Sequence, residues 1–574
     1  MAKVTLEILN PKGVLVSPEV EGLKVPRVSD LNGKTIGLLS EKPDSQLFFN
    51  TMERLLKQAY PTVKILRFPS PANPEEPDNT LEVCEKCDCW LQGVKTSTSS
   101  RNDYDVRREK CGKPGVSFSV DTLMHQKRVV AEINGLPTIR VISVPSLPYF
   151  KAKADQEMMD KVAEALFDET VAALTTPLTE AEMNPPQFVY DYSPIRFEGD
   201  SDEDVYEQFQ QYCMDNDMGD GLPLVPPTRS RVDEMLTGIS YPPEKEIGVV
   251  LPRGGMATVE KIAINAVMAG AKPEYLPVIV AMVSCYTDKN FNQYHINTGP
   301  MPVTWISGPM IDELGISNYI DYMGPGHRVN NTIARASALC QINIGWRILS
   351  VYADPGGPGS PSNFTNFFIP ENAELSPWGS YARSCGFAED ETVITTCECT
   401  RQFRGPNETL YYGDFEDSME LMASFFPARS SNYGMNRSIS ENDRYLIVMH
   451  PTFAHQLADA GYTKESCIQW IYDRNAIVWD KMDEQQREAF RQDVINGKWK
   501  NLDPEECKSG LVLEPFHDAS QFAIIISGSA NGVTMVFGTN TGSTAKIADC
   551  PPDFEPRPFM QRVIHGATKT RYGK

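Results

Sequence analysis

The sequence predicts an α/β protein built in two main parts. Between residues 34 and 175, short apolar runs typical of buried strands alternate with amphipathic helical segments. The same alternation returns over residues 443–535, after a stretch of short apolar pieces broken by Gly, Pro and Asn. This β-α-β rhythm implies a parallel sheet covered by helices, similar to a flavodoxin-like fold, followed by a larger α/β domain.

Changes in composition divide the chain into four segments. Residues 1–34 are expected to form an extended arm, and residues 35–175 the flavodoxin-like domain. Residues 176–200 are Pro-rich and acidic without periodicity, which is typical of a linker. Residues 201–574 are expected to form the larger α/β domain, which would bind the substrate.

The spacing of apolar residues along the sequence assigns each element of the first domain to a strand or a helix. The expected strands are Thr35–Leu39, Val63–Leu66, Asp88–Leu91 and Thr138–Val144. The expected helices are Ser45–Ala59, Ser119–Asn134 and Asp155–Ala173.

The second domain is assigned in the same way. The expected helices are Ser201–Asn216, Arg229–Leu236, Thr258–Ala269, Glu274–Tyr286, Ile333–Leu339, 453–460 and 464–474. The expected strands are Phe364–Ile369, 393–410, Tyr445–Met449 and Phe522–Ser527. The two helices within 258–286 are rich in small residues and could pack across a dimer, which would make the protein a homo-oligomer.

Composition and charge limit the classes of partner that we expect for this protein. The chain has 574 residues, of which 41% are apolar and 23% charged, with a net charge of −22 and no long basic run. This argues against nucleic acid or an anionic membrane as partner. The N-terminus has no signal-peptide core, and the apolar runs are too short to span a membrane. We therefore expect a cytoplasmic protein whose 13 cysteines are mostly free thiols.

The cysteines are unevenly placed, because Cys84, Cys87, Cys89 and Cys111 fall close together. Thiolates are strong nucleophiles and soft-metal ligands, so this excess suggests redox or metal chemistry. The alternative is a chance cluster of small buried thiols.

Cys84, Cys87 and Cys89 form C-x-x-C-x-C, a spacing similar to the cobalt- or iron-binding run of nitrile hydratases, with Asp88 where that family has Ser. A bound metal (Fe, Co, Cu or Zn) is one hypothesis, and a structural zinc could also recruit Cys397 and Cys399. The metal hypothesis is weakened because a strand would point alternate side chains in opposite directions.

Cys111 is the preferred nucleophile. If residues 88–91 form a strand, the loop 93–118 leaves from its carboxyl end, where open parallel sheets bind ligands. Cys111 would then precede the helix expected from Ser119, and the helix N-terminus and two neighbouring lysines would favour a thiolate. The alternative is a surface cysteine in a long loop.

A second candidate zone covers residues 293–378 and is dense in His, Asn, Arg and Gly. A glycine-rich loop that feeds a helix, with Arg and His beside it, can hold a carboxylate or phosphate. Asn330 or Asn331 is the expected N-cap of that helix. The alternative is an ordinary turn and a capped helix. The candidate substrate-binding residues are His295, Asn297, Gly324, Gly326, Arg328, Asn330, Asn331 and Thr332, with His327 as a catalytic candidate.

Further candidates follow expected strands. Glu371 and Trp378 come after the strand at 364–369 and could supply a general acid/base and an aromatic wall. The alternative there is a capped helix start. His450 ends another strand and is interpreted as a buried histidine, while the glycine-containing run after Ser527 could cradle an anion.

Two regions resemble a known family. The Cys111-Gly112 loop, the helix after it and Gly135-Leu136-Pro137-Thr138-Ile139 resemble the UGSC family of selenocysteine- or cysteine-containing proteins, and distantly the selenoprotein subunit of glycine and betaine reductases. Residues 219–380 resemble the larger uncharacterised companion protein often paired with UGSC-type domains. The resemblance spans about residues 30–150 and 215–540.

The chain departs from the family pattern at the reactive loop. The family has (Sec/Cys)-Gly-Ser-Cys, whereas this chain has Cys111-Gly112-Lys113-Pro114, without the second cysteine. If the family motif is aligned on residues 96–98 instead, Ser99 occupies the reactive position. Any dithiol exchange would therefore need a second thiol from elsewhere in the fold or from a partner.

These observations predict a thiol-dependent enzyme that cleaves or reduces a carbon–heteroatom bond of a small anionic substrate. Cys111 would attack, while His327 and Arg328 would hold the substrate near Glu371. The alternatives are a cysteine-ligated metalloenzyme of the hydratase or lyase type and a non-catalytic metal or ligand binder.

Overall fold

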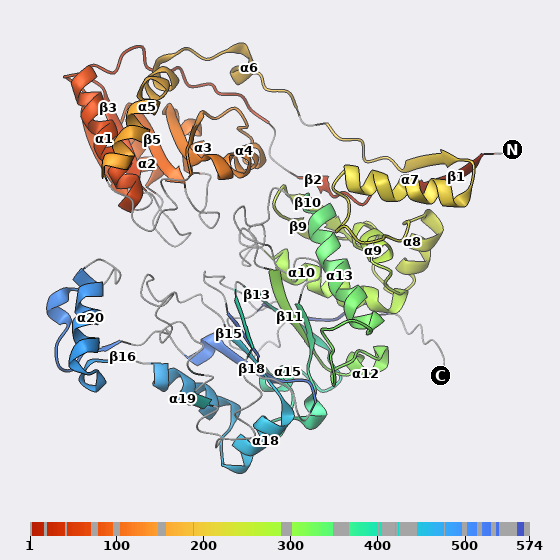
Figure 1. Ribbon diagram of the computed structural model, residues 1–574. Helices are drawn as coiled ribbons and strands as arrows, with labels where there is room; N and C mark the ends of the chain where they lie inside the picture. Colours follow the sequence, from red (N-terminus) through yellow and green to blue (C-terminus); the bar gives the residue numbers. More distant parts are fainter. Residues whose placement is uncertain are drawn as a thin grey trace.

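The computed structural model shows two lobes joined by extended segments (Figure 1). The lobe drawn mainly in red to orange holds the N-terminal sheet, and the other lobe holds the yellow-to-blue segments together with the red start of the chain. The structure describes residues 3–16, 20–40, 43–69, 79–95, 104–146, 156–187, 189–288, 301–347, 367–399, 401–404, 419–420, 423, 445–475, 477–495, 502–513, 519–529, 535–538 and 560–567.

The first lobe is built on a parallel sheet with the strand order β4-β3-β5-β6-β7. Numbered within the lobe, this is the 2-1-3-4-5 order of flavodoxin-like folds, so the predicted fold class is confirmed. The strands are β3 (Thr35–Ser40), β4 (Lys64–Pro69), β5 (Cys89–Lys95), β6 (Gly115–Val120) and β7 (Val141–Val144).

Helices cover both faces of this sheet, as a parallel sheet requires. On one face, α1 (Pro43–Ala59) packs against α5 (Gln156–Thr175) over a core that contains Phe48 and Phe118. The other face carries α2 (Thr80–Lys86), α3 (Tyr104–Lys110) and α4 (Met124–Ile133).

The predicted start of the helix over residues 119–134 is wrong. The chain first completes β6, and α4 begins only at Met124. Val116, Phe118 and Val120 enter one core with the period of a strand, and their alternation with serine is the strand pattern that the predicted helix overlooks. The sequence also gives no sign of α3, because five of its seven residues are charged next to a short apolar stripe.

The N-terminal arm packs against the second lobe and pairs with its strands. Lys12 is buried there, and its ammonium donates to the carbonyl of Asp217 at 2.7 Å. An ion pair between Arg253 and Glu132 adds a direct contact between the lobes. The pairings of the arm are β1 (Val4–Ile8) with β8 (Ile195–Gly199) and β2 (Val14–Leu15) with β10 (Gly255–Thr258), which also pairs with β9 (Glu246–Val250).

The second lobe is a sandwich of helices, sheet, sheet and helices. One sheet has the order β12-β11-β13-β20 and the other has the order β14-β19-β15-β18. The strands are β11 (Met301–Ser307), β12 (Phe367–Pro370), β13 (Val393–Cys399), β14 (Arg401–Arg404), β15 (Tyr445–Met449), β18 (Phe522–Ile526), β19 (Met535–Gly538) and β20 (Met560–Val563).

The alternation of side chains along the strands explains why the two sheets stack. In β11, Trp305 enters the core between the sheets, while Ile306 enters the core under the helices. In β15, Leu446 and Val448 enter the core between the sheets, and Ile447 faces the other way. Each sheet therefore has two apolar faces, one covered by the other sheet and one by helices.

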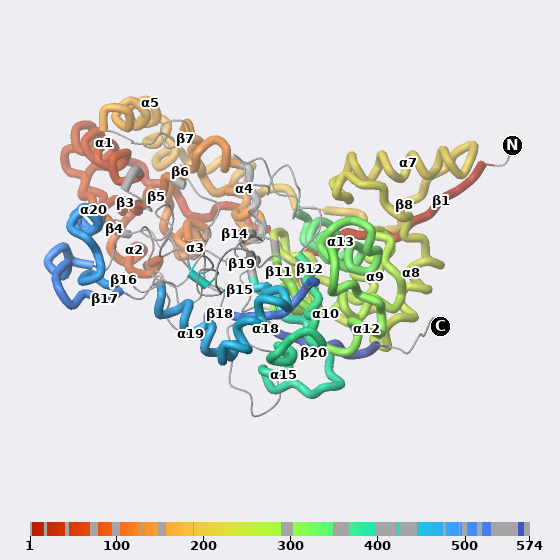
Figure 2. The backbone as a smooth tube through the Cα atoms, turned by 60° about the horizontal axis from the view of Figure 1, so that its bottom comes forward, coloured from red at the N-terminus to blue at the C-terminus, as the bar shows by residue number. Residues whose placement is uncertain are grey.

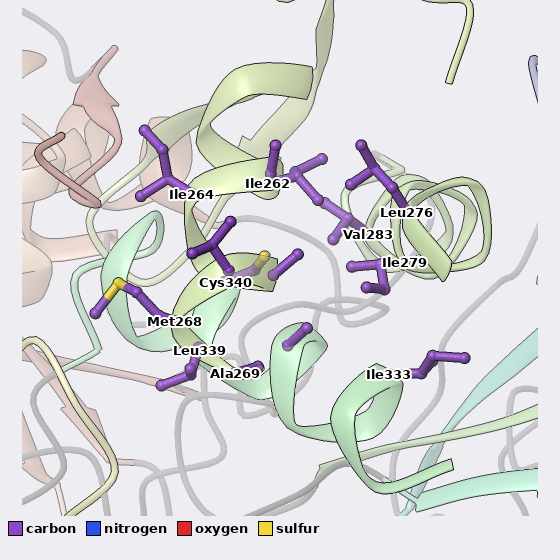
Figure 3. Close-up of a cluster of buried hydrophobic side chains, with 14 of the residues drawn as sticks. Ile262, Ile264, Met268, Ala269, Leu276, Ile279, Val283, Ile333, Leu339 and Cys340 are labelled. Atoms are coloured by element: carbon purple, nitrogen blue, oxygen red, sulfur yellow. The ribbon is translucent and has the colours of Figure 1, made fainter. Parts of the chain in front are cut away.

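The helix layers close the sandwich on both outer faces. Figure 3 shows apolar side chains of α9, α10 and α13, among them Ile262, Val283 and Cys340, gathered in one core. Because α9 and α10 are buried inside the chain, they pack within this protein, and the homo-oligomer stays a prediction. The helices are α9 (Val259–Met268), α10 (Leu276–Tyr286) and α13 (Arg328–Asn343) on one side, and α18 (Pro451–Asp459) and α19 (Lys464–Asn475) on the other.

A small blue module at the edge of the molecule has a core of its own (Figure 2). It consists of β16 (Ile477–Val478), α20 (Glu484–Ile495) and β17 (Val512–Leu513). The remaining longer helices are α7 (Asp202–Asp215) and α8 (Arg229–Leu236), close to their predicted bounds. Among the residues that the structure describes, no helix combines the length and the apolar character needed to cross a membrane.

The substitution Trp305→Ala tests the stacking of the two sheets. Trp305 is fully buried between them, so its removal leaves a large cavity that should cost about 3–5 kcal/mol of stability. Calorimetry should show a lower unfolding temperature for the second lobe. The control Leu222→Ala changes a side chain that is 46% exposed, and it should leave that transition unmoved. Equal effects of the two substitutions would contradict the stacked core.

Candidate active site

A pocket of about 700 Å³ opens at the carboxyl ends of β11 and β12. These strands are parallel neighbours, and in α/β sheets ligands bind beyond the carboxyl ends of such strands. The walls come from the segment after β11, which includes α12 (Met310–Leu314), and from the segment after β12, which includes α15 (Tyr381–Ser384). The pocket therefore has the position expected of a small-molecule site.

The two stacked sheets bring four strand ends together beside this pocket. Ser527, which follows β18, donates from its hydroxyl to the carbonyl of Pro370 at 2.6 Å. The N–H of Asn372 donates in return to the carbonyl of Ile526 at 2.7 Å. The N–H of Ser527 also bonds the last residue of β15, Met449. The ends of β12, β15 and β18 are thus fixed to each other, and β11 pairs directly with β12.

Glu371 is the first residue after β12, and its carboxylate is buried at this junction. Both carboxylate oxygens accept the N–H of Tyr381, at 2.8 and 3.0 Å, where the chain enters α15. The ammonium of Lys464 lies 4.0 Å from one oxygen and donates to the carbonyl of Gly379 at 3.1 Å. The carboxylate therefore holds the turn at 379–381 and lies beside a buried cation.

Burial controls the protonation of this pair. It raises the pKa of the Glu371 carboxyl above its usual value, and the charge of Lys464, the Ser307 hydroxyl and the Tyr381 N–H offset the rise only in part. Burial likewise lowers the pKa of Lys464, with Glu371 acting in the opposite direction. Both groups are thus shifted toward their neutral forms, which suits a group that takes up and releases protons.

The rim of the pocket is acidic. Arg383 lies on the wall and forms an ion pair with Glu389. The other acidic residues on the walls are Asp312, Glu374 and Glu391, in addition to Glu371. This charge balance opposes an anion and favours a neutral or cationic ligand.

Trp378 lines the same pocket as Glu371, so the structure brings together two of the predicted site residues. Its indole N–H donates to the carbonyl of Tyr462 at 3.0 Å, which fixes the ring against the helix layer of α18 and α19. The role of Trp378 as a wall for the substrate stays a prediction. Sequence reasoning missed Lys464, which looks like an ordinary solvated lysine at the start of a helix.

The segment from 324 to 332 uses its polar groups to close its own turn. The imidazole of His327 contacts the carbonyl of Ile320 at 3.1 Å, and Arg328 donates to the carbonyl of Gly270. Asn331 donates to the carbonyl of Gly324, and the Thr332 hydroxyl donates to Arg328 within the helix. Gly326 adopts a φ of 104°, a conformation that favours glycine.

The predicted N-cap of this helix is wrong. The helix begins at Arg328 with His327 as its N-cap, so Asn330 and Asn331 lie in its first turn. Asn330 is buried and bonds both backbone groups of Ser317, with a further bond to the carbonyl of Tyr322. These bonds fix the chain next to Asn318, which lines the pocket, so the segment supports the site from outside.

The predicted position of Cys111 is also wrong. The chain forms α3 between β5 and β6, and Cys111 is the exposed residue that follows α3. It therefore lies at a helix C-terminus and at the entry to β6, on the opposite edge from the carboxyl ends of the strands. In Figures 1 and 2, α3 and α13 lie in different lobes, so the structure does not bring Cys111 to the turn at 324–332. Its catalytic role stays a prediction.

The geometry of C-x-x-C-x-C does not fit a metal claw. Cys89 enters the core between the sheet and α1 and α5, whereas Cys87 enters the core on the opposite face. Cys84 lies in α2, and Cys397 is buried between the two sheets of the other lobe. Within the described ranges, no group of three or more His, Cys, Asp or Glu is arranged to hold a metal ion. His295, Asn297 and Ser99 lie outside the described residues.

Comparisons with known proteins add one family. No curated protein matches this chain. A solved fungal multi-domain GH3 β-N-acetylglucosaminidase with a GCN5-related glucosamine N-acetyltransferase region is 14% identical, with 41% of this chain and 24% of that chain covered. Its TM-score is 0.17, so the likeness carries no argument. Residues 7–176, which include the whole parallel-sheet lobe, match the model of the UGSC family, so this part of the chain supports the family resemblance.

Proposed function

We propose that this protein is an enzyme that cleaves a carbon–heteroatom bond of a small molecule by acid–base catalysis. The observation that carries the proposal is the buried carboxyl group of Glu371 on the wall of the pocket, with its pKa raised by burial. Burial favours the protonated form of this group more than that of an exposed glutamate, so the group is better suited to give a proton as well as to take one. In an elimination, one group can take a proton from carbon and then give it to the leaving group.

The chemistry of the walls supports a division of roles. Glu371 would act as the general base and then as the general acid, and Lys464 would keep part of its population ionised. Trp378 would cover an apolar face of the substrate. The acidic rim supports a neutral or cationic substrate, in place of the anionic substrate that the sequence suggests. The proposal needs no thiol and no metal ion.

A ligand screen on the full-length protein tests the proposal first. We expect small neutral or cationic compounds to raise its unfolding temperature, because a ligand that binds only the folded state stabilises it. Compounds that do so are then assayed for turnover. A response limited to anionic compounds would contradict the acidic pocket as the substrate site.

The substitution Glu371→Gln separates catalysis from structure. The amide oxygen of glutamine can still accept the Tyr381 N–H, so we expect the fold to persist. With a substrate from the screen, kcat should fall about 10²–10⁴-fold while KM changes little. The matched control is Glu374→Gln, an exposed carboxylate on the same wall, which should keep kcat close to the wild-type value. Unchanged kcat in Glu371→Gln would show that Glu371 is structural.

The substitution Lys464→Met tests the electrostatic coupling. The lysine charge lowers the pKa of Glu371, so its removal should raise that pKa further. Because the base must be ionised to accept a proton, the acidic limb of the kcat–pH profile should move to higher pH. The conservative variant Lys464→Arg keeps the charge and should move the limb less. An acidic limb that stays in place in Lys464→Met would contradict the assignment of Glu371 as the base.

A further inference from the structure

Two thiols of the first lobe lie close together although they are far apart in the sequence. Cys84 lies in the last turn of α2, and Cys111 lies in the turn that follows α3. The two helices pack side by side on the same face of the sheet. The Cys84 sulfur lies 4.0 Å from the carbonyl of Arg108, three residues before Cys111, and the Cys111 thiol is close enough to raise the pKa of Cys84. The fold thus supplies the second thiol that the sequence motif lacks.

This pair differs from the other cysteines in its access to solvent. Cys111 is exposed and Cys84 is partly exposed, whereas the other cysteines whose side chains the structure describes are buried. Gly112, which follows Cys111, has a φ of 88° and open space around it, so the turn leaves room for an incoming reagent. A dissolved disulfide can therefore reach Cys111 without unfolding of the lobe.

We propose that Cys84 and Cys111 form a site of reversible oxidation that exchanges with low-molecular-weight disulfides. The Cys111 thiolate attacks one sulfur of the disulfide RSSR, which forms a mixed disulfide and releases one RS⁻. The Cys84 thiol then loses its proton and attacks the Cys111 sulfur, which forms the Cys84–Cys111 bond and releases the second RS⁻. The two thiolates take up the two protons, so two protein thiols are oxidised and one RSSR is reduced to two RSH.

The surroundings of Cys84 set the order of the two steps. Burial raises the pKa of Cys84 to about 11, and contact with Cys111 raises it as well, while Arg108 and Lys113 act in the opposite direction. Cys84 is therefore mostly protonated at neutral pH, so the exposed Cys111 attacks first and Cys84 resolves the intermediate. Once Cys111 is part of a mixed disulfide, it no longer opposes ionisation of Cys84.

The test uses the full-length protein and oxidised glutathione. Wild-type protein is incubated with the disulfide, its remaining thiols are blocked with an alkylating reagent, and the peptides are identified by mass spectrometry. We expect a peptide pair joined through Cys84 and Cys111 that disappears after treatment with dithiothreitol. The Cys84→Ser variant should accumulate glutathione on Cys111 instead, and Cys111→Ser should form neither product at this pair.

The matched control is Cys87→Ser, which changes a buried thiol of the same sequence window and should form the joined peptides like the wild type. The proposal is overturned if both thiols are alkylated after incubation with glutathione disulfide. It is also overturned if the mixed disulfide on Cys111 persists equally in the wild type and in Cys84→Ser. This site is independent of the Glu371 pocket, so failure of one proposal leaves the other standing.

Discussion

The burial of the Glu371 carboxylate at the end of β12 is the constraint on which the second lobe depends. A buried carboxylate is costly unless the fold supplies hydrogen bonds and a compensating charge. The Tyr381 N–H and the ammonium of Lys464 supply them, and Lys464, at the start of α19, also donates to the carbonyl of Gly379 in the turn that Tyr381 ends. The same contacts that compensate the charge therefore shape the pocket wall.

The stacked sheets explain why this site exists where it does. A single sheet presents its strand ends along one line, but two sheets packed face to face bring the ends of β12 and β18 within hydrogen-bonding distance. The apolar layer around Trp305 fixes their relative position. A change in the packing between the sheets would consequently shift the strand end that carries the Glu371 carboxylate.

The sequence predicts the parts of this protein better than their arrangement. The helix at 156–175 shows its type directly, because one apolar face dominates its pattern, and the strand at 445–449 shows its type as a short, continuously apolar run. The helix α3 is hidden by its charged residues, and this shifts Cys111 to the opposite edge of the sheet. Glu371 and Trp378 are found from their place after a strand, whereas Lys464 is not, since nothing local marks a lysine that is buried only by tertiary packing.

The most direct measurement of the central claim is infrared difference spectroscopy of the wild-type protein against Glu371→Gln across pH. The carbonyl stretch of a protonated carboxyl group is resolved from that of an ionised one, so the difference spectrum reports Glu371 alone. The account predicts that the protonated band of Glu371 persists above the pH at which ordinary glutamates ionise. Loss of that band at the pH typical of an exposed glutamate would contradict it.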